Sequence, residues 1–388
     1  MDKGGRHSFR LGHVLTISIA HLVHDIYSSF LAPLLPLLID RLSLSYAQAG
    51  FLSVAQRLPS LLNPLVGVIA DRVNVRYFII VSPSITAVVM SLLGAVPHYG
   101  FLIILLLVMG VSASLFHVPG PVMIKHLSGD RVGKGMSFYM LGGELARTLG
   151  PLVILAAVSY WSMEGTWRLI PFGLAASLVL FIKVRKLRVP GAKQAGDTES
   201  GGSWSIRHLV PFFVILSGFI FFRACLKAAL TIYLPTFLTA RGGSLWMGGI
   251  ALSIIQFSGA AGTFFGGSIS DKIGRRTTLL IAAVASPALM GLFLLAPGAW
   301  TVPLLIVMGI FLFAQGPVLL ALAQDHAGSR PALVNGIYMT LSFLIASLGV
   351  MIVGTLGDWL GLETTFQISA LLAFGAIPIV LKLQKPAR

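Results

Sequence analysis

Long apolar runs separated by short polar joints fill the chain from end to end. We identify twelve such runs, at residues 12–39, 46–70, 77–97, 100–125, 134–161, 166–185, 209–239, 246–270, 277–297, 302–324, 331–356 and 362–382. About 20 apolar residues in a helix span the hydrocarbon core of a bilayer, so each run is long enough to cross it. The runs do not alternate as barrel strands do, and an open sheet would leave unsatisfied edges in lipid. The pattern predicts an all-α membrane protein with twelve transmembrane helices.

The longest polar stretch, residues 186–208, divides six runs from six. It holds Pro190 and four glycines, a composition typical of a linker. We therefore predict a six-helix bundle at 1–185, a cytoplasmic linker at 186–208 and a second six-helix bundle at 209–388.

Two of the joints carry nearly the same charged sequence, 200 positions apart. Residues 67–76 read GVIADRVNVR, and residues 267–276 read GSISDKIGRR. The similarity extends without a gap through 46–76 and 246–276, and an offset of 202 places Pro33 over Pro235. Repeats of this kind predict a carrier built from two pseudo-symmetric halves, related by an axis along the membrane normal.

Composition and charge fit a membrane protein. Hydrophobic residues make up 56% of the chain and charged residues 11%, whereas soluble domains carry roughly 25% charged residues. The net charge of +15 would suggest nucleic acid in a soluble protein. With the N-terminus placed inside, however, 21 of the 28 Lys and Arg fall in inner segments and 3 in outer ones. The positive-inside rule then predicts an inner (plasma) membrane protein with both termini cytoplasmic and no nucleic-acid partner.

Other sequence features exclude further classes. The first run is of spanning length and has no clear cleavage site, so we expect a retained helix rather than a signal peptide. Cys225 is the single cysteine, which rules out an intrachain disulfide. The sequence has no Walker-type phosphate loop and no repeated channel filter, and its loops are too short for a nucleophile–base set. We therefore expect neither an ATP-driven pump, nor a channel, nor an enzyme.

The doubled Gly-x-x-x-Asp-Arg/Lys joint, after the second and eighth runs, resembles the signature of the major facilitator superfamily. The second copy matches fully, while the first has Asn74 where glycine is usual. Asn is the next-best residue for a left-handed turn. The resemblance covers the whole chain and implies the fold of that superfamily, with twelve helices in two six-helix bundles.

A closer resemblance is to the fosmidomycin-resistance-like exporters. It rests on three segments, His21-Leu-Val-His24-Asp25, Phe116-His117-Val-Pro119-Gly120, and Gly142-Gly143 through Gly150-Pro151. The third segment also resembles a partial antiporter motif of small residues, in which Ala146 and Ile154 replace common glycines. Small residues one turn apart let two helices approach closely. The resemblance implies a proton-driven exporter of a drug or metabolite.

Six ionisable residues fall near the middle of predicted spans, where insertion scales put the cost of a charge at about 2.5–3.5 kcal/mol. They must face one another or a watery cavity, and they are Asp25, Arg57, Glu144, Arg147, Arg223 and Lys227. We interpret the two acids, Asp25 and Glu144, as proton-coupling residues. The alternatives are an ion pair at Asp25 that locks two helices, and local cancellation of Glu144 by Arg147, three residues on.

Around Asp25 we predict substrate contacts. His21, His24 and Asp25 share a helix face with Ser28. Arg57, near the centre of the second run, is expected to pair with Asp25 or with an anionic group of the substrate. The two histidines could in principle bind metal, but the sequence shows no further ligand cluster, so we predict no metal site.

In the second half, basic residues stand at the positions that correspond to His21 and Asp25. At the offset of 202, Arg223 and Lys227 fall on His21 and Asp25. Cations outnumber acids four to two among the six residues, which favours an anionic or zwitterionic substrate. The alternative is that one of these cations snorkels to an interface.

Further candidates for substrate contact are polar residues inside other spans: His117, Arg147, Gln56, Gln256 and Gln315. His117 precedes Pro119 and Gly120 and suits a proton relay or a substrate contact. The glutamines equally suit hydrogen bonds between helices.

The two charged joints are predicted to gate the cytoplasmic side. Each Asp can accept from a neighbouring helix N-terminus and from local Arg. The alternative is that the joints only mark topology. The predicted gating residues are Gly67, Asp71, Arg72, Arg76, Gly267, Asp271, Lys272, Arg275 and Arg276, with Gly150 and Pro151 of the fifth run.

Together these features predict a proton-coupled exporter, an antiporter of a small anionic or zwitterionic organic compound or drug, working by alternating access. The alternatives are a proton-coupled importer of an organic anion and a non-transporting membrane sensor. We expect no cofactor, because the proton gradient supplies the energy. The expected partners are a small-molecule substrate, protons and the lipid bilayer, with the protein as a monomer.

Overall fold

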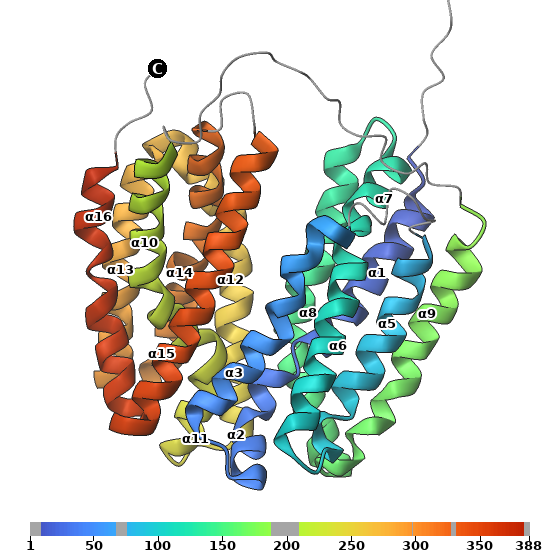
Figure 1. The fold of residues 1–388 in the computed structure, drawn as a ribbon, viewed down its shortest axis with the longest axis horizontal. Helices are drawn as coiled ribbons and strands as arrows, with labels where there is room; N and C mark the ends of the chain where they lie inside the picture. Colours follow the sequence, from blue (N-terminus) through green and yellow to red (C-terminus); the bar gives the residue numbers. More distant parts are fainter. Residues whose placement is uncertain (1–8, 67–75, 188–208, 297, 327–330, 384–388) are drawn as a thin grey trace, which may run out of the picture. The chain divides into compact units, whose positions relative to one another are not determined.

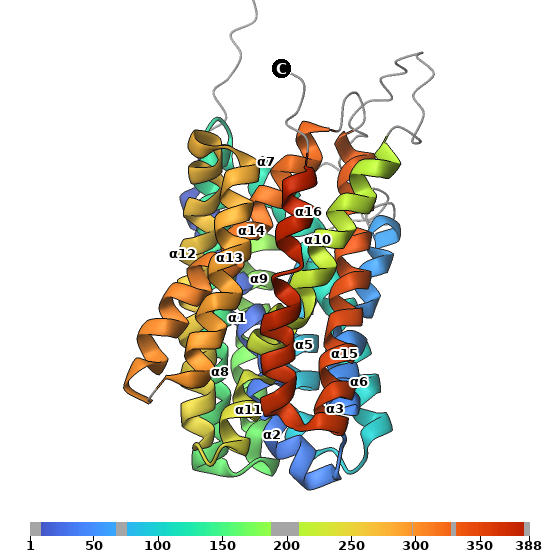
Figure 2. The same cartoon turned by 90° about the vertical axis from the view of Figure 1, so that its left-hand side faces the viewer.

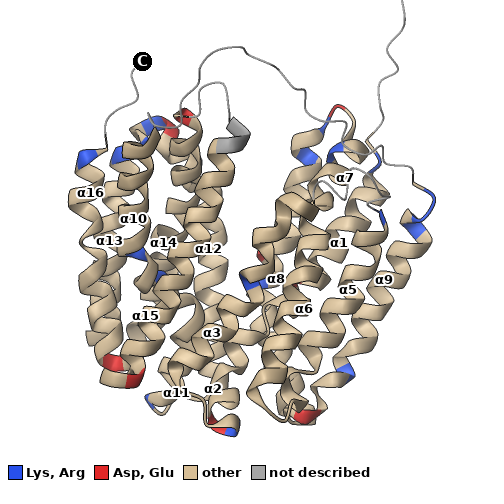
Figure 3. Cartoon of the chain, in the orientation of Figure 1, with Lys and Arg blue, Asp and Glu red and all other residues tan. Residues whose placement is uncertain are grey.

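The computed structural model describes residues 9–66, 76–187, 209–296, 298–326 and 331–383. Helices dominate these residues and no strand occurs among them, which confirms the all-α class (Figure 1). Within each compact part of the chain the helices run along a common direction, and the second view agrees (Figure 2). Most Lys and Arg of each part lie at one end of its helices (Figure 3).

The chain divides into two compact units whose borders do not simply follow the sequence. The first unit comprises Met1–Leu42 and Leu52–Asp197, and the second comprises Ser43–Phe51 and Thr198–Arg388. The start of the second predicted span therefore packs within the second unit. The predicted domain borders at 185 and 209 assign this segment to the N-terminal bundle.

This segment is held by its backbone. It contains the first turns of α3 (Tyr46–Arg57), and the Asp358 carboxylate accepts from the N–H groups of Tyr46 at 2.5 Å and Ala47 at 3.0 Å. The Tyr233 hydroxyl donates to the Tyr46 carbonyl at 3.0 Å. The first amides of a helix have no partner within it, so a carboxylate at this end stabilises it.

The first unit is built mainly from α1 (Leu11–Ser28), α2 (Leu31–Leu42), α5 (Arg76–Ser91), α6 (Tyr99–His117), α7 (Pro119–Ser128), α8 (Val132–Trp161) and α9 (Ile170–Val184). Short 3₁₀ turns occupy Leu58–Leu62, Leu93–Ala95 and Glu164–Leu169. Pro119 opens α7, a position where its missing N–H costs no hydrogen bond. The break that it makes after His117 sets the place of that histidine at the end of α6.

The second unit is built from α10 (Val210–Ala228), α11 (Leu234–Ala240), α12 (Leu245–Ile273), α13 (Arg275–Leu295), α14 (Thr301–Asp325), α15 (Pro331–Ala373) and α16 (Ala376–Lys382). A π-helical turn at Ala229–Tyr233 joins α10 to α11, and a 3₁₀ turn at Gly298–Trp300 precedes α14. Gly274, between α12 and α13, has φ of +93°, a left-handed value that favours glycine.

Ten described segments are long and apolar enough to cross a membrane, against the twelve predicted. In the second predicted span α3 ends at a 3₁₀ turn containing Pro59, and residues 67–75 lie outside the described part. The last segment, Val334–Lys382, has 49 residues, which as one helix would measure about 74 Å, well beyond a hydrocarbon core of about 30 Å. Two helices meet within it at Gly361, whose φ is 76°. These two features account for the difference in number.

Helices α1 and α8 pack closely through the predicted small-residue motif. A Cβ added at Gly142 would lie 2.5 Å from the Ser18 carbonyl oxygen, and one added at Gly150 would lie 2.6 Å from Cβ of Ser29. Pro151 follows inside α8 and is buried. The motif therefore acts here as sequence reasoning predicts for small residues, because it brings the backbones of two helices together.

Candidate functional site

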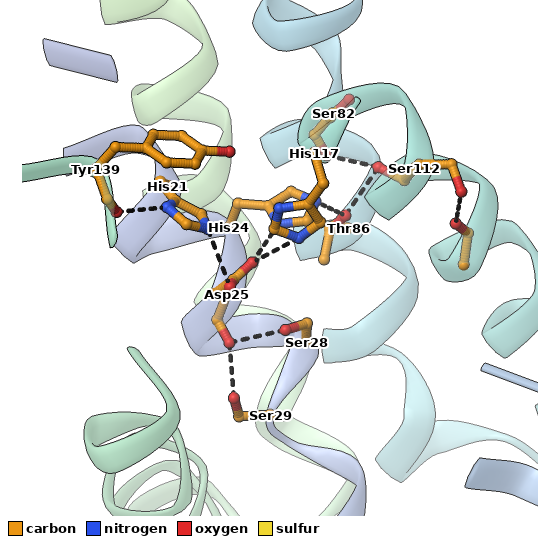
Figure 4. Close-up of polar contacts among 12 residues, drawn as sticks. His21, His24, Asp25, Ser28, Ser29, Ser82, Thr86, Ser112, His117 and Tyr139 are labelled. Atoms are coloured by element: carbon orange, nitrogen blue, oxygen red, sulfur yellow. Dashed lines mark hydrogen bonds and ion pairs between the residues drawn. The ribbon is translucent and has the colours of Figure 1, made fainter. Parts of the chain in front are cut away.

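A carboxylate ringed by three imidazoles lies inside the first unit (Figure 4). Asp25 contacts His21 Nε2 at 3.2 Å, His24 Nδ1 at 2.9 Å and His117 Nε2 at 3.2 Å. His24 is completely buried and Asp25 is 6% exposed, while the side chain of His117 is 39% exposed. We call these four residues the histidine–aspartate cluster.

The cluster is assembled by local helix geometry and one long-range contact. His21, His24 and Asp25 are spaced along one face of α1, as the sequence predicts. His117 comes from the end of α6, nearly a hundred residues away, so its arrival could not be read from the local pattern. The predicted role of His117 as a relay or contact residue thus gains a definite partner, Asp25.

Aromatic packing fixes the rings of the cluster. The Tyr139 ring stacks on His21 with centroids 4.0 Å apart, and the Phe116 ring stacks on His24 at 4.7 Å. Opposite His21, Gly143 of α8 leaves room for the ring, because an added Cβ would lie 2.8 Å from its Cε1. These contacts hold the imidazole nitrogens against the carboxylate.

Two hydrogen-bond paths leave the cluster. His21 Nδ1 donates to the Tyr139 carbonyl at 2.8 Å. His24 Nε2 lies 3.0 Å from Thr86 Oγ1, which donates to Ser112 Oγ at 2.8 Å, and Ser112 Oγ donates to the Ser82 carbonyl at 3.0 Å. Neither Thr86 nor Ser112 is predicted from the sequence. A buried hydroxyl in an apolar run usually bonds its own helix, as Ser114 does to the Gly110 carbonyl, and nothing in the sequence separates the two cases.

Ser28, predicted on the Asp25 face, and Gln56, a predicted substrate contact, both bond to backbone oxygens. The Ser28 hydroxyl donates to the backbone oxygen of Asp25 at 2.9 Å rather than to its carboxylate. Gln56 Nε2 donates to the Ser28 carbonyl at 2.8 Å, so this glutamine links two spans of the first unit. Gln56 was interpreted either as a substrate contact or as a hydrogen bond between helices, and the observed contact is a hydrogen bond between helices.

The predicted pairing of Arg57 with Asp25 is not formed. Three imidazoles already surround the carboxylate, and Arg57 stands at the last residue of α3, where the helix gives way to the 3₁₀ turn. Its side chain is exposed, and a charged neighbour that acts on it is Arg147, a like charge. Within the described residues Arg57 has no ion pair, which leaves the predicted anionic group of a substrate as its alternative partner.

Glu144 and Arg147 pair with each other on α8. The glutamate side chain is 19% exposed and that of the arginine 42%. Local cancellation, one of the two interpretations drawn from their spacing, is therefore the contact observed. Neither side chain forms an ion pair with Asp25.

The second unit buries a cation instead of an acid. Arg223 of α10 is 9% exposed, and its Nη1 has no hydrogen-bond partner among the described residues. Lys227, one turn further, lies with Nζ 5.5 Å from the centre of the Phe313 ring. Because Arg223 is buried, snorkelling to an interface does not describe it.

Every described carboxylate of the second unit is engaged elsewhere. Asp271 and Asp325 both contact Arg275, the latter at 3.3 Å, and Glu363 accepts from Arg241 Nε at 2.6 Å. Asp358 accepts from the backbone of α3, as described above. The guanidinium of Arg223 therefore has no counter-ion among the described residues of its own unit.

Two predicted glutamines of the second unit are also incompletely bonded. Gln315, 2% exposed, donates weakly to Ser286 Oγ and to the Phe311 carbonyl, both at 3.3 Å. The Oε1 atoms of Gln315 and Gln256 are buried and have no partner in the described part of the chain. Buried acceptors without partners are costly, so both atoms suit a ligand or water that completes them.

The second charged joint is braced by a network centred on Arg275. Arg275 Nη1 contacts Asp271 and donates to Ser270 Oγ at 2.6 Å, while its Nε donates to Asp325 at the end of α14. Arg276 Nη2 donates to the Leu381 carbonyl at 2.8 Å. The remaining predicted residues of this joint, Gly267 and Lys272, lie at the end of α12, where Lys272 is exposed. The local Arg contact predicted for Asp271 is present.

The first charged joint is only partly visible. Gly67, Asp71 and Arg72 lie outside the described residues, so their predicted gating role has no structural description. Arg76 opens α5, and its Nη1 donates to the Leu187 carbonyl at 2.9 Å.

The cluster also has the spacing of a cation site. His21, Asp25 and His117 each offer a ligand atom within 4.8 Å of the others, a grouping that the sequence did not reveal because it requires His117. All three ring contacts with Asp25 also have hydrogen-bond lengths.

Comparison with known proteins places this geometry in context. A family model described as Major Facilitator Superfamily matches residues 17–350. The fosmidomycin resistance protein of Escherichia coli (strain K12) is 26% identical over 364 residues, covering 92% of this chain and 89% of the relative. An uncharacterized MFS-type transporter, YfnC of Bacillus subtilis (strain 168), is 23% identical over 370 residues, covering 92% and 90%. A solved bacterial homolog of the human lysosomal transporter Spinster shares the fold with a TM-score of 0.80 at 17% identity, covering 100% of both chains.

Proposed function

The chain belongs to the major facilitator superfamily, and from this premise we propose that it is a proton-coupled secondary transporter that exports a small anionic or zwitterionic organic compound. Membership of a family of transporters also makes the chain a non-enzyme. We place it in the plasma membrane, as a monomer with both termini in the cytoplasm. The gathering of Lys and Arg at one end of the helices of each unit supports that orientation.

The observation that carries the proposal is the histidine–aspartate cluster. A bare carboxylate is costly inside a membrane protein, and Asp25 is ringed by three imidazoles, a side chain that exists in a neutral and a protonated form. A structural ion pair would use Arg or Lys, whose charge is permanent. Histidine partners instead let the site change its charge as the carrier is loaded and unloaded.

The substrate charge is inferred from Arg223. Its guanidinium is buried, has a free Nη1 and lacks a counter-ion among the described residues of its unit. An arginine presents a planar fork that matches carboxylate or phosphate. An anionic group on the substrate would supply the missing charge, with the buried Oε1 atoms of Gln256 and Gln315 as acceptors for donors on the same molecule.

Export is supported by the similarity to the fosmidomycin resistance protein, which is named for resistance to a compound. The partial small-residue motif of α8 agrees with exchange of substrate for protons. The second candidate is an importer that carries an organic anion together with protons. One observation favours it: a proton on the cluster and an anion at Arg223 have opposite charges, so binding of one does not oppose binding of the other.

Alternating access requires contacts that form on one side and break in the cycle. The Asp271–Arg275–Asp325 network suits this role, because its members come from α12, α13 and the end of α14. We propose that the network helps to close the cytoplasmic side. The first joint, with Asp71, would act as its counterpart in the repeat.

Flux measurements test the proposal. Thermal-shift screening of the purified protein at two pH values, across phosphonates including fosmidomycin, organic acids and antibiotics, first identifies ligands. The best ligand is then followed in proteoliposomes with an imposed proton gradient and a metal chelator present. We expect accumulation on the acidic side and none after the gradient is collapsed. Accumulation on the alkaline side would instead establish the importer, binding without flux would establish a sensor, and a requirement for metal would reject protons as the coupling ion.

A further inference from the structure

We propose that the histidine–aspartate cluster holds two exchangeable protons rather than one, and that Thr86 and Ser112 act as positioning residues that enforce this number. The inference deepens the proposed proton coupling and rests on it for its meaning in transport. The number of protons itself follows from the directions of the hydrogen bonds around the cluster.

The direction of the Thr86–Ser112 path is fixed from its far end. A carbonyl oxygen only accepts hydrogen bonds, so Ser112 donates its single hydroxyl hydrogen to the Ser82 carbonyl, 3.0 Å away. Ser112 Oγ must then accept the hydroxyl hydrogen of Thr86, whose Oγ1 lies 2.8 Å away. Thr86 Oγ1 is left as an acceptor for His24 Nε2 at 3.0 Å. The neutral form of His24 therefore carries its hydrogen on Nε2 and turns a bare Nδ1 toward Asp25.

His21 also turns a nitrogen without hydrogen toward Asp25, because its other ring nitrogen is bonded to a different partner. Its Nδ1 donates to the Tyr139 carbonyl at 2.8 Å, so the neutral ring has no hydrogen on Nε2. That bare Nε2 faces Asp25 Oδ2 at 3.2 Å. His117 differs, because none of the described contacts fixes its Nδ1, and it can donate to Asp25 Oδ1 from Nε2 as a neutral ring.

Counting hydrogens gives the number of protons that the contacts with Asp25 require. With three neutral rings and an ionised Asp25, two of the three nitrogen–oxygen contacts would join lone pairs at 2.9–3.2 Å in a buried place. Each of these contacts becomes a hydrogen bond when one proton is added, on either the ring or the carboxyl. The cluster therefore passes from net charge −1 through 0 to +1 as it takes up two protons.

The surroundings of the cluster contain few other charges to alter this count. From α8 the facing titratable group is Tyr139, and Arg147 acts on His117 while paired with Glu144. From α5 the contact is Thr86, and from α6 it is Ser112 together with His117 itself, so the charges on these two helices near the cluster are limited to that imidazole. The two protons are consequently held by α1 residues whose tautomers are set by neighbours from α5 and α8.

Nitrogen-15 NMR of histidine-labelled protein in lipid bilayers tests the inference without a substrate. Spectra are assigned with His21→Gln and His24→Gln variants and recorded from alkaline to acidic pH, while infrared spectra follow the Asp25 carboxyl. At alkaline pH we expect His24 protonated on Nε2 and His21 on Nδ1, followed by uptake of two protons. An Nδ1-protonated neutral His24, or uptake of one proton, would overturn the inference.

Three hydroxyl variants make the test specific to positioning. Thr86→Val removes the acceptor at His24 Nε2, and Ser112→Ala frees the Thr86 hydroxyl to donate to that nitrogen. In both variants His24 can carry its hydrogen on Nδ1 and donate to Asp25, so the uptake should fall from two protons to one. Ser114 lies on α6 with Ser112, and its buried hydroxyl bonds to the Gly110 carbonyl, so Ser114→Ala should leave the uptake at two protons. Two protons in Thr86→Val and Ser112→Ala would show that the path does not set the number.

The outcome is separable from the proposed function. Two protons counted by NMR in a protein whose flux ignores the gradient would refute proton coupling and leave the cluster as described. Gradient-driven flux with a cluster that takes up one proton would keep the function and reject the second proton.

Discussion

The two units place opposite chemistry at matching positions of the repeat. At the offset of 202, His21 and Asp25 of the first unit correspond to Arg223 and Lys227 of the second. The Asp25 charge is met inside its own unit by three imidazoles at 2.9–3.2 Å. The Arg223 charge is buried with Nη1 unbonded, and all four described carboxylates of its unit are engaged elsewhere. One unit thus surrounds its buried acid with imidazoles, while the other leaves its buried guanidinium without a counter-ion among the described residues.

Removing the acid should have the largest effect. Asp25→Asn eliminates the negative charge that the three imidazoles share, so gradient-driven transport should fall to background while some substrate binding remains. The measurement is flux in proteoliposomes beside ligand affinity. Asp40→Asn, an exposed acid of the same unit, is the matched control and should transport normally. Full gradient-driven flux in Asp25→Asn would refute the role given to the first unit.

Replacing Arg223 should separate binding from stability. Hydrogen bonds to charged groups contribute about 1.5–3 kcal/mol, so Arg223→Met should weaken an anionic ligand roughly 10- to 150-fold. The same change removes a buried charge that has no counter-ion among the described residues of its unit, and it should raise the thermal unfolding midpoint, as replacement of buried ions often does.

Two further arginine variants sharpen that contrast. Arg223→Lys keeps the charge without the planar fork and should restore part of the affinity. Arg241→Met, which breaks an exposed pair with Glu363, should change stability by at most about 1 kcal/mol and leave affinity unchanged. Unchanged affinity with lower stability in Arg223→Met would mean that Arg223 is structural.

A smaller effect is expected from crowding the cluster. An added Cβ at Gly143 would lie 2.8 Å from His21 Cε1, so Gly143→Ala should displace the ring, cost about 1–3 kcal/mol and alter the pH dependence of flux. The control lies on the same helix: at Gly133 nothing stands within 4 Å of an added Cβ. Gly133→Ala should be neutral or stabilise the protein by about 0.5–1 kcal/mol. Equal pH profiles for the two variants would argue against a fixed His21 ring.

The smallest effect is expected at the pair on α8. Because Glu144 and Arg147 contact each other, the double variant Glu144→Gln with Arg147→Gln should keep gradient-driven flux within a few fold of the wild type. The single variant Glu144→Gln leaves Arg147 unpaired and should be the more impaired of the two. If both variants lose flux completely, Glu144 is a second coupling acid, as its position in the sequence first suggested.

The sequence predicts what depends on local geometry and on repetition. The helical class, the two-fold repeat and the shared face of His21, His24 and Asp25 follow from apolar runs and helical spacing, and the structure agrees for the class and that face. Partner choice depends on packing between distant segments and was less predictable. Asp25 was expected to meet Arg57 and instead meets His117. Thr86 was overlooked because a hydroxyl inside an apolar helix gives no sign of whether it bonds its own backbone or a neighbour.

Residues 43–51 have a consequence for cutting the protein in two. A fragment that ends in the linker would carry this segment without Asp358 and Tyr233, leaving the opening amides of α3 to be satisfied by water or lipid headgroups. The complementary fragment would keep the Asp358 and Tyr233 side chains without the α3 backbone groups to which they bond. Split halves produced from separate genes should therefore be unstable when alone and recover when mixed, since each polypeptide contains a piece that completes the other.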